Sequence, residues 1–385
     1  MAHFSIFKIV WPACDLSSMI VFLTAFFASA LAVWLIIRSE HLHRHLTADS
    51  DLGGVQKFHV VAVPRVGGLG ILIGMLASAC WLSLLLAEPP YQTWLLLMVA
   101  SPAFFGGITE DMTKKVGVLP RLLLTMLSAV TGYWFLGAAL TRLDIPLIDS
   151  MLSELWPVSL MLTAVAVGGV ANAINLIDGY NGLAAMVSAG VALCLAFVGF
   201  LLGDNFIVVS GLSLAGALCG FLLWNFPFGR IFLGDGGAYL VGFLLAELSV
   251  LLVARHPHVS AWFPMLLLFY PVFETLFTIV RRVSSHAGSP GHPDACHMHQ
   301  MLYKRVVRWH VGSKDPFHRT MRNALTSPYL WVLWALSAVP ALLFWRYPVM
   351  LLLSCVGFAV VYVWLYRRLV RWRTPKWLIV YRRRS

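Results

Sequence analysis

The sequence predicts an all-α integral membrane protein with about eleven transmembrane helices, an N-terminus outside the membrane and a C-terminus in the cytoplasm. The chain is 59% hydrophobic and only 12% charged, with a mean hydropathy of +0.80, whereas soluble domains are about 25% charged. Apolar runs of about 20 residues recur throughout, each long enough to cross roughly 30 Å of hydrocarbon. Of the 28 Lys and Arg residues, 24 fall in alternate connecting segments, which is the positive-inside pattern.

The apolar runs define the expected spans, and we expect residues 1–385 to form one polytopic membrane domain. The spans are 17–37, 66–87, 93–108, 120–139, 156–174, 183–202, 206–224, 237–254, 261–280, 327–345 and 348–366. The first run contains Ala28-Ser29-Ala30, which resembles a signal-peptidase site. Because the run continues to Ile37, we interpret it as a span and not as a cleaved signal.

The basic residues set the expected orientation. The cytoplasmic segments are then 38–65, 109–121, 225–236, 281–326 and 367–385, and the basic residues left outside are Lys8, Arg142, Arg255 and Arg346. Segment 281–326 is a long His-containing loop. Segment 367–385 is a basic tail with interleaved aromatic residues, which we expect to lie on anionic lipid headgroups.

The net charge of +11 therefore reflects topology. Nucleic-acid binding would require a basic face on a folded soluble domain, and we expect no nucleic-acid partner. The six cysteines are scattered without a CxxC pair, so they indicate neither a disulfide framework nor a closed zinc site.

Four polar clusters interrupt the apolar pattern at the predicted cytoplasmic side. The first contains Glu110, Asp111 and Lys114. Adjacent carboxylates raise each other's proton affinity unless a cation is near, and a divalent metal or Lys114 would supply one. The alternative is an ordinary charged loop.

The second cluster ends an apolar span. Asn172, Asn175 and Asp178 are three residues apart and share one helix face, and Asn181 follows beyond the helix break. Polar groups in a membrane helix are costly, which makes them candidates for function. Asn and Gly also end helices in the ordinary way, so capping is the alternative.

The third cluster runs from Asn225 through Phe232 to Asp235, and a Gly-Asp-Gly-Gly turn opens the next span. The N–H groups of a helix N-terminus suit an anion, and Asp235 is a hard oxygen ligand suited to Mg²⁺. The alternative is an Asp that caps the helix, followed by turn glycines.

The fourth cluster lies in the long loop, where His297 and His299 could bind phosphate, transfer a proton or ligate a metal. Arg281 and Arg282 end the preceding span as membrane anchors or as phosphate clamps. Glu274 and Glu247 lie inside spans, where each could be neutral, paired or near a cavity.

Together the clusters resemble the polyprenyl-phosphate N-acetylhexosamine-1-phosphate transferase family, over roughly residues 57 to 305. Five motifs recur in family order. The matching residues are Lys57, His59, Pro64, Arg65, Gly67 and Gly68; Glu110, Asp111 and Lys114; Asn172, Asn175, Asp178, Gly179, Gly182 and Leu183; Asn225, Phe232, Gly234, Asp235 and Gly237; and Ser289, Pro290, Pro293, Asp294, His297 and His299.

Three positions depart from the family pattern. Glu110 replaces the first Asp of the acidic pair, Asn181 replaces a second Asp, and Gln300 replaces the last His of the loop. These departures suggest a sub-branch that uses a different sugar, with an impaired enzyme as the alternative.

The resemblance implies a membrane enzyme that transfers a sugar 1-phosphate from a UDP-sugar to a polyprenyl phosphate and releases UMP. It implies Mg²⁺, or Mn²⁺, as cofactor and a site on the cytoplasmic face of the bacterial inner membrane; a homodimer is left open. The catalytic residues implied are Glu110, Asp111, Asp178, Asp235, His297 and His299, with Asp235 and Asp111 on the metal. The substrate-binding residues implied are Lys57, His59, Arg65, Lys114, Asn172, Asn175, Asn181, Asn225, Phe232, Arg281 and Arg282.

Two other classes of protein fit the composition. A multispan transporter or flippase would place its site near the bilayer midplane, in broken helices related by repeats, whereas the clusters here gather at one face and no repeat is visible. A membrane scaffold that binds substrate without turnover is the third interpretation, motivated by the three departures.

Overall fold

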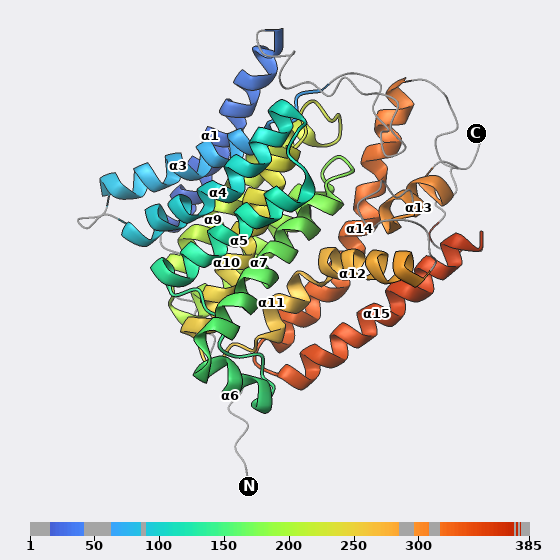
Figure 1. Ribbon diagram of the computed structural model, residues 1–385. Helices are drawn as coiled ribbons and strands as arrows, with labels where there is room; N and C mark the ends of the chain where they lie inside the picture. The colour runs from blue at the N-terminus through green and yellow to red at the C-terminus, as the bar shows by residue number, and fades with distance from the viewer. Residues whose placement is uncertain are drawn as a thin grey trace.

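The structure is a computed structural model that describes residues 16–41, 63–85, 90–284, 296–307, 316–372, 375 and 378, and the part it describes is helical. The helices are α1 (Leu16–Arg38), α3 (Gly67–Leu85), α4 (Tyr91–Thr113), α5 (Val118–Leu136), α6 (Pro146–Glu154), α7 (Trp156–Ile177), α8 (Leu183–Leu202), α9 (Asn205–Asn225), α10 (Gly234–Arg255), α11 (Trp262–Leu267), α12 (Phe269–Ser284), α13 (Met298–Arg305), α14 (Pro316–Phe344) and α15 (Pro348–Val370). Most of the long helices run side by side as one bundle (Figure 1).

Ten helices within the described residues are long and apolar enough to cross a membrane, one fewer than the sequence predicts. The difference is the span expected at 261–280, which is broken into α11 and α12 at Leu268. Figure 1 shows α12 lying across the direction of α11. Pro271 has no N–H with which to continue the hydrogen bonds of α11. Glu274 and Thr278 place polar groups on one side of α12, so this helix is amphipathic and not apolar all round.

Helix α10 is the centre of the bundle and is buried over almost its whole length. Small residues bring its neighbours close. A Cβ atom on Gly107 of α4 would lie 2.4 Å from the Asp235 carbonyl oxygen, and one on Gly68 of α3 would lie 2.4 Å from the Gly237 backbone. Membrane helices associate through such close contacts because lipid offers no hydrophobic driving force between them. The N-terminus of α10 is therefore fixed against α3 and α4.

Two turns complete the same end of the bundle. The turn between α7 and α8 ends at Gly182, with φ of 74°, and the turn between α9 and α10 ends at Gly234, also with φ of 74°. A side chain at Gly234 would collide with the Arg65 carbonyl oxygen at 1.9 Å. Glycine is needed there both for its backbone conformation and for the close approach of the 63–66 segment.

Candidate active site

The C-terminal end of α4 binds the N-terminus of α10 through Asp111. Its Oδ1 accepts a hydrogen bond from the Asp235 N–H at 2.9 Å, and its Oδ2 accepts one from the Gly236 N–H at 2.8 Å. The residue is 3% exposed. A carboxylate at this position satisfies two N–H groups that have no partner within the helix and interacts favourably with the helix dipole. The first and third sequence clusters thus meet in one contact.

Asp235 gathers side chains from three further elements. Its Oδ1 accepts a hydrogen bond from Asn175 Nδ2 of α7 at 2.5 Å, and its Oδ2 accepts one from the Arg121 guanidinium of α5. Arg65 lies 3.9 Å from a carboxylate oxygen of both Asp235 and Asp111. The structure therefore brings Arg65 and the first, second and third clusters together around Asp235.

Asp178 lies beside this group, directly after α7. The Gly234 N–H is hydrogen-bonded to its carboxylate. Burial raises the pKa of Asp178 well above its ordinary value, while the nearby Arg65 charge lowers it and the charges of Asp235 and Asp111 raise it. This carboxyl group therefore gains a proton more readily than an exposed aspartate would.

The carboxylates of this cluster fit a divalent metal by their chemistry. Among the described residues, the carboxyl groups of Asp111, Asp178 and Asp235 lie beside the guanidinium groups of Arg65 and Arg121, and a bound cation would favour the ionised form of these carboxyl groups. No group of three or more candidate ligands with metal geometry occurs in the described part of the chain. Mg²⁺ is usually held by one or two carboxylates completed by substrate phosphates, so the fit rests on Asp235 with one further carboxylate.

The histidine cluster is built on α13. His297 precedes the helix and its Nδ1 lies 3.2 Å from both Glu274 Oε1 and Thr278 Oγ1 of α12. The Met298 N–H donates to Glu274 Oε1 at 3.0 Å, and the Tyr362 hydroxyl donates to Glu274 Oε2 at 2.5 Å. Burial alone would raise the pKa of Glu274, but His297, His299 and Tyr362 outweigh it and hold that pKa below its ordinary value.

His299 joins this cluster to the turn that follows α7. Its ring is 5.2 Å from the Tyr180 ring and is stacked at 5.2 Å on the His297 ring. A Cβ atom on Gly179 would lie 3.6 Å from His299 Nε2. Both histidines are buried, at 7% and 3% exposure. The second and fourth clusters therefore also adjoin.

Comparison with known proteins gives a consistent assignment. Residues 93–253 match the family model of glycosyl transferase family 4. A probable undecaprenyl-phosphate N-acetylglucosaminyl 1-phosphate transferase from Bacillus subtilis is 30% identical over 291 residues, which covers 74% of this chain and 78% of the relative. An undecaprenyl-phosphate alpha-N-acetylglucosaminyl 1-phosphate transferase from Thermotoga maritima is 29% identical, with 66% and 72% covered. A phospho-N-acetylmuramoyl-pentapeptide-transferase from Geobacillus kaustophilus is 30% identical, with 49% and 60% covered.

The chain belongs to glycosyl transferase family 4. In this member, two of the unusual residues have structural partners. The His297 N–H donates to Gln300 Oε1 at 3.2 Å, so Gln300 completes the cap of α13. The Asn181 N–H donates to Asn323 Oδ1 at 2.7 Å, and Asn181 Nδ2 donates to the Pro227 carbonyl at 3.0 Å. Asn181 is 1% exposed, so it joins α14 to the turn before α10.

The other residues expected at the site, which include the catalytic candidate Glu110, lie in varied surroundings. Buried Asn225 accepts from the Gly182 N–H and donates to the Ile231 carbonyl. Asn172 Oδ1 accepts from the Tyr239 hydroxyl at 3.4 Å. Glu110 Oε2 accepts from the Val116 N–H at 2.6 Å, which shapes the loop that contains exposed Lys114. Phe232 is half-buried, and its N–H donates to the Pro64 carbonyl at 2.9 Å. Arg281 is half-buried and Arg282 is buried, both on α12. Lys57 and His59 lie outside the described residues.

Arg121 is the residue that the sequence analysis missed. It is buried, donates to Asp235 Oδ2, and places its guanidinium 5.5 Å from the centre of the Tyr239 ring. The sequence holds a signal for it, because Arg121 is an arginine one turn inside an otherwise apolar span. Its position in segment 109–121 alone indicates only a basic residue that contributes to the predicted orientation.

Proposed function

We propose that this chain transfers an N-acetylhexosamine 1-phosphate from a UDP-sugar to a polyprenyl phosphate, releases UMP and leaves a polyprenyl diphosphate-sugar in the membrane. The observation that carries the proposal is the meeting of Asp111, Asn175, Asp235, Arg65 and Arg121 at one end of the bundle. The names of the relatives supply the substrate class.

The proposed reaction is a displacement at phosphorus. An oxygen of the lipid phosphate forms a bond to the β-phosphorus of the UDP-sugar, and the bond from that phosphorus to the bridging oxygen breaks. UMP leaves with the electron pair. Such transfers depend on positioning and on electrostatic stabilisation more than on covalent help from the protein. The second pKa of a phosphate monoester is about 6, so the attacking oxygen needs no strong base at neutral pH.

In this proposal, the arginines and the carboxylates of the cluster around Asp235 have different roles in the transfer. Arg65 and Arg121 supply fixed guanidinium groups suited to phosphate oxygens. Mg²⁺, or Mn²⁺, would neutralise charge on the diphosphate when bound, held by Asp235 with Asp111. Asp111 also fixes the N-terminus of α10, whose dipole favours the anionic reactants. In this proposal Asp111 and Glu110 orient the lipid phosphate.

The donor is proposed to occupy the space between the carboxylate and histidine clusters. Asp178 and Asn175 would shape the nucleotide site, with Phe232 against the uracil ring. His297, His299 and Arg282 would hold phosphate or sugar oxygens, because Glu274 and Thr278 fix the orientation of the His297 ring. Asn181 and Asn225 would act through the backbone turns that they support.

The proposed location is the bacterial inner membrane, with the cluster facing the cytoplasm, where UDP-sugars are made. It is supported by the 24 basic residues in the segments assigned to that side and by the bacterial relatives. No observation favours a transporter.

The test is UMP release by the purified protein from UDP-GlcNAc and its C4-epimeric and deoxy relatives, with polyprenyl phosphate and Mg²⁺. Asp235→Asn should lower the rate about 100-fold or more, the scale of losing one charged contact to a transferring group. Glu154→Gln, at the exposed end of α6, is the matched control. A folded sample without turnover on any donor would overturn the proposal, and full activity of Asp235→Asn would overturn the metal assignment.

A further inference from the structure

The last helix of the chain reaches the histidine cluster through two tyrosines. Tyr362 and Tyr366 lie four residues apart on α15, so they share one face of that helix. The Tyr362 hydroxyl donates to Glu274 Oε2 at 2.5 Å, and the Tyr366 hydroxyl donates to the Cys296 carbonyl at 3.0 Å. Cys296 directly precedes His297. One face of α15 therefore contacts both the carboxylate beside His297 and the backbone that leads into it.

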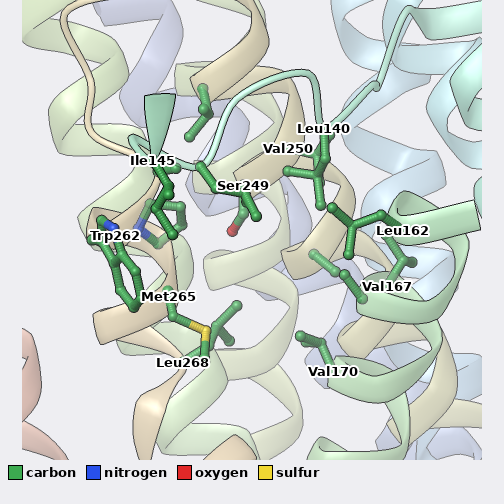
Figure 2. Close-up of a pocket in the computed structure, with 16 residues that line it drawn as sticks. Leu140, Ile145, Leu162, Val167, Val170, Ser249, Val250, Trp262, Met265 and Leu268 are labelled. Atoms are coloured by element: carbon green, nitrogen blue, oxygen red, sulfur yellow. The ribbon is translucent and has the colours of Figure 1, made fainter. Parts of the chain in front are cut away.

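The polar side of α12 faces the histidine cluster and not the apolar cavity beside α11. That cavity, of about 290 Å³, is lined by side chains of α7, α10 and α11. Figure 2 shows Trp262 and Leu268 at this space, the second of them at the break between α11 and α12. Neither Glu274 nor Thr278 lines the cavity. After the break, these two polar groups contact His297 instead.

The Glu274 carboxylate is held through both of its oxygens. Oε1 accepts from the Met298 N–H at 3.0 Å and lies 3.2 Å from His297 Nδ1, while Oε2 accepts from the Tyr362 hydroxyl. Within the described part of the chain, Oε2 has no other hydrogen-bond partner. The terminal torsion of a glutamate side chain has only a broad preference, so contacts on one oxygen alone leave the carboxylate free to turn. Tyr362 therefore removes this freedom.

Tyr362 is itself fixed by aromatic neighbours. Its side chain is fully buried. The centre of its ring lies 5.0 Å from that of Phe273, 5.4 Å from that of Phe277 and 6.2 Å from that of Phe358. A buried tyrosine hydroxyl usually finds a hydrogen-bond partner, and in these apolar surroundings the Glu274 carboxylate supplies it. The packed ring thus sets the position of the hydroxyl, and the hydroxyl sets the position of the carboxylate.

The contacts on His297 use one ring nitrogen and leave the other. Nδ1 lies 3.2 Å from both Glu274 Oε1 and Thr278 Oγ1. Nε2 makes no hydrogen bond within the described residues. A carboxylate that accepts the Nδ1–H of a histidine fixes the tautomer and the orientation of the ring, and Nε2 is then the nitrogen available to a ligand.

We propose that Tyr362 is a positioning residue of the transferase. Its hydroxyl holds the Glu274 carboxylate on the Nδ1–H of His297, so that His297 presents Nε2 to the phosphate and sugar oxygens of the UDP-sugar. This inference rests on the function proposed above. It adds a residue from α15, a helix that lies beyond the region of family resemblance at 57–305 and beyond residues 93–253 of the family model.

The first measurement is steady-state UMP release by the purified full chain with polyprenyl phosphate, Mg²⁺ and the UDP-sugar that wild type uses. Tyr362→Phe keeps the ring and removes only the hydroxyl. We expect kcat to fall about 10-fold, the scale of one hydrogen bond to a charged group. KM for the UDP-sugar should stay within about twofold, because the change is one of orientation. Tyr270→Phe is the matched control and should keep the wild-type kcat, since Tyr270 is buried on α12 and its hydroxyl has no hydrogen-bond partner within the described residues.

A double-mutant cycle separates positioning from packing. Because the hydroxyl acts through the charge of Glu274 in this proposal, Tyr362→Phe should lower kcat by less than about twofold in the Glu274→Gln background. A tyrosine that only packs α15 against α12 would lower kcat by the same factor in both backgrounds, and that result overturns the proposal.

The second measurement is ¹⁵N NMR of histidine-labelled protein at a pH where the His297 ring is neutral, with its signals identified by their absence in His297→Gln. Wild type and Tyr270→Phe should carry the proton on Nδ1, whereas Tyr362→Phe should show both tautomers. Unchanged His297 signals in Tyr362→Phe overturn the proposal whatever the rate. This readout needs no turnover. A wild type that releases no UMP from any donor overturns the proposed function, whereas equal rates in wild type and Tyr362→Phe overturn only the positioning role.

Discussion

At the residue scale, the ion pair with Arg121 fixes the orientation of the Asp235 carboxylate. The arginine is buried between Asp235 and the Tyr239 ring, and its Nε also donates to the Gly117 carbonyl at 3.2 Å. This fixed geometry uses the planar fork of arginine, which lysine lacks. A lysine ammonium at the same position could pair with Asp235, but it could not also hold the carboxylate in this orientation.

We therefore expect Arg121→Lys to lower the rate of UMP release about 10- to 100-fold, because a hydrogen bond to a charged group contributes about 1.5–3 kcal/mol. Lys115→Arg, in the exposed loop after α4, should leave the rate unchanged. The measurement is the initial rate at saturating donor. A rate within twofold of wild type in Arg121→Lys would assign Arg121 to folding alone.

Glu274 gives a prediction about pH. The pKa of this carboxyl is lowered by His297, His299 and Tyr362 despite its burial, so the ionised form is favoured in the folded protein. Its contribution to stability is complete above the ordinary value of 4.5 and is lost as the pH falls through the lower folded-state value.

We expect the unfolding temperature of wild type to fall more steeply below about pH 4.5 than that of Glu274→Gln. Glu154→Gln, which removes an exposed carboxylate, should keep the wild-type slope. The measurement is thermal unfolding in detergent from about pH 3.5 to about pH 7, a range that includes the ordinary pKa of a glutamate. Parallel curves for wild type and Glu274→Gln would contradict the lowered pKa.

At the element scale, the sequence predicted the long helices well because their signal is local. Ten apolar runs became helices of membrane length. The run at 261–280 did not form one such helix. Its mean hydropathy does not reveal that Glu274 and Thr278 form a polar side, or that Pro271 lacks an N–H. The partner of that polar side, His297, lies 23 residues after Glu274 and outside the run, so the run alone does not predict the contact.

The packing of α4 on α10 gives the prediction at this scale. Gly107→Ala would place a methyl group 2.4 Å from the Asp235 carbonyl oxygen, so α10 would have to shift. We expect a loss of about 1–3 kcal/mol in the free energy of unfolding and a lower transfer rate, because the shift moves Asp235. The measurement is thermal unfolding alongside UMP release.

Gly169→Ala is the matched control. Gly169 also lies inside a membrane helix, but a Cβ atom there would meet nothing within 4 Å. Alanine is a better helix former than glycine by about 1 kcal/mol, so this variant should be as stable as wild type or more so. Equal behaviour of the two alanine variants would show that helix propensity, and not the contact with α10, decides the outcome.

At the scale of the whole molecule, the bundle has two chemically distinct ends. One end gathers carboxylates, histidines and Arg121, and the other gathers Arg142, His258 and Arg346. The sequence predicted the first gathering, because the predicted topology puts the polar clusters on one membrane face and the motifs resemble those of a known family. It did not predict the second, since Arg142 and Arg346 are far apart in the chain and no motif connects them. These basic groups come together only in the folded protein, where the segments that follow α5, α10 and α14 line one cleft.

The orientation of these ends is the last prediction. Because 24 of the 28 basic residues lie in the connecting segments that the sequence analysis assigns to one side, the positive-inside rule predicts that the carboxylate end faces the cytoplasm. With native cysteines replaced, Glu154→Cys should react with a membrane-impermeant maleimide in intact spheroplasts, whereas Lys115→Cys should react only after permeabilisation. Both side chains are exposed, so burial does not bias the comparison. The reverse pattern would place the proposed UDP-sugar site outside, away from its donor, and the reaction could not run in the cell.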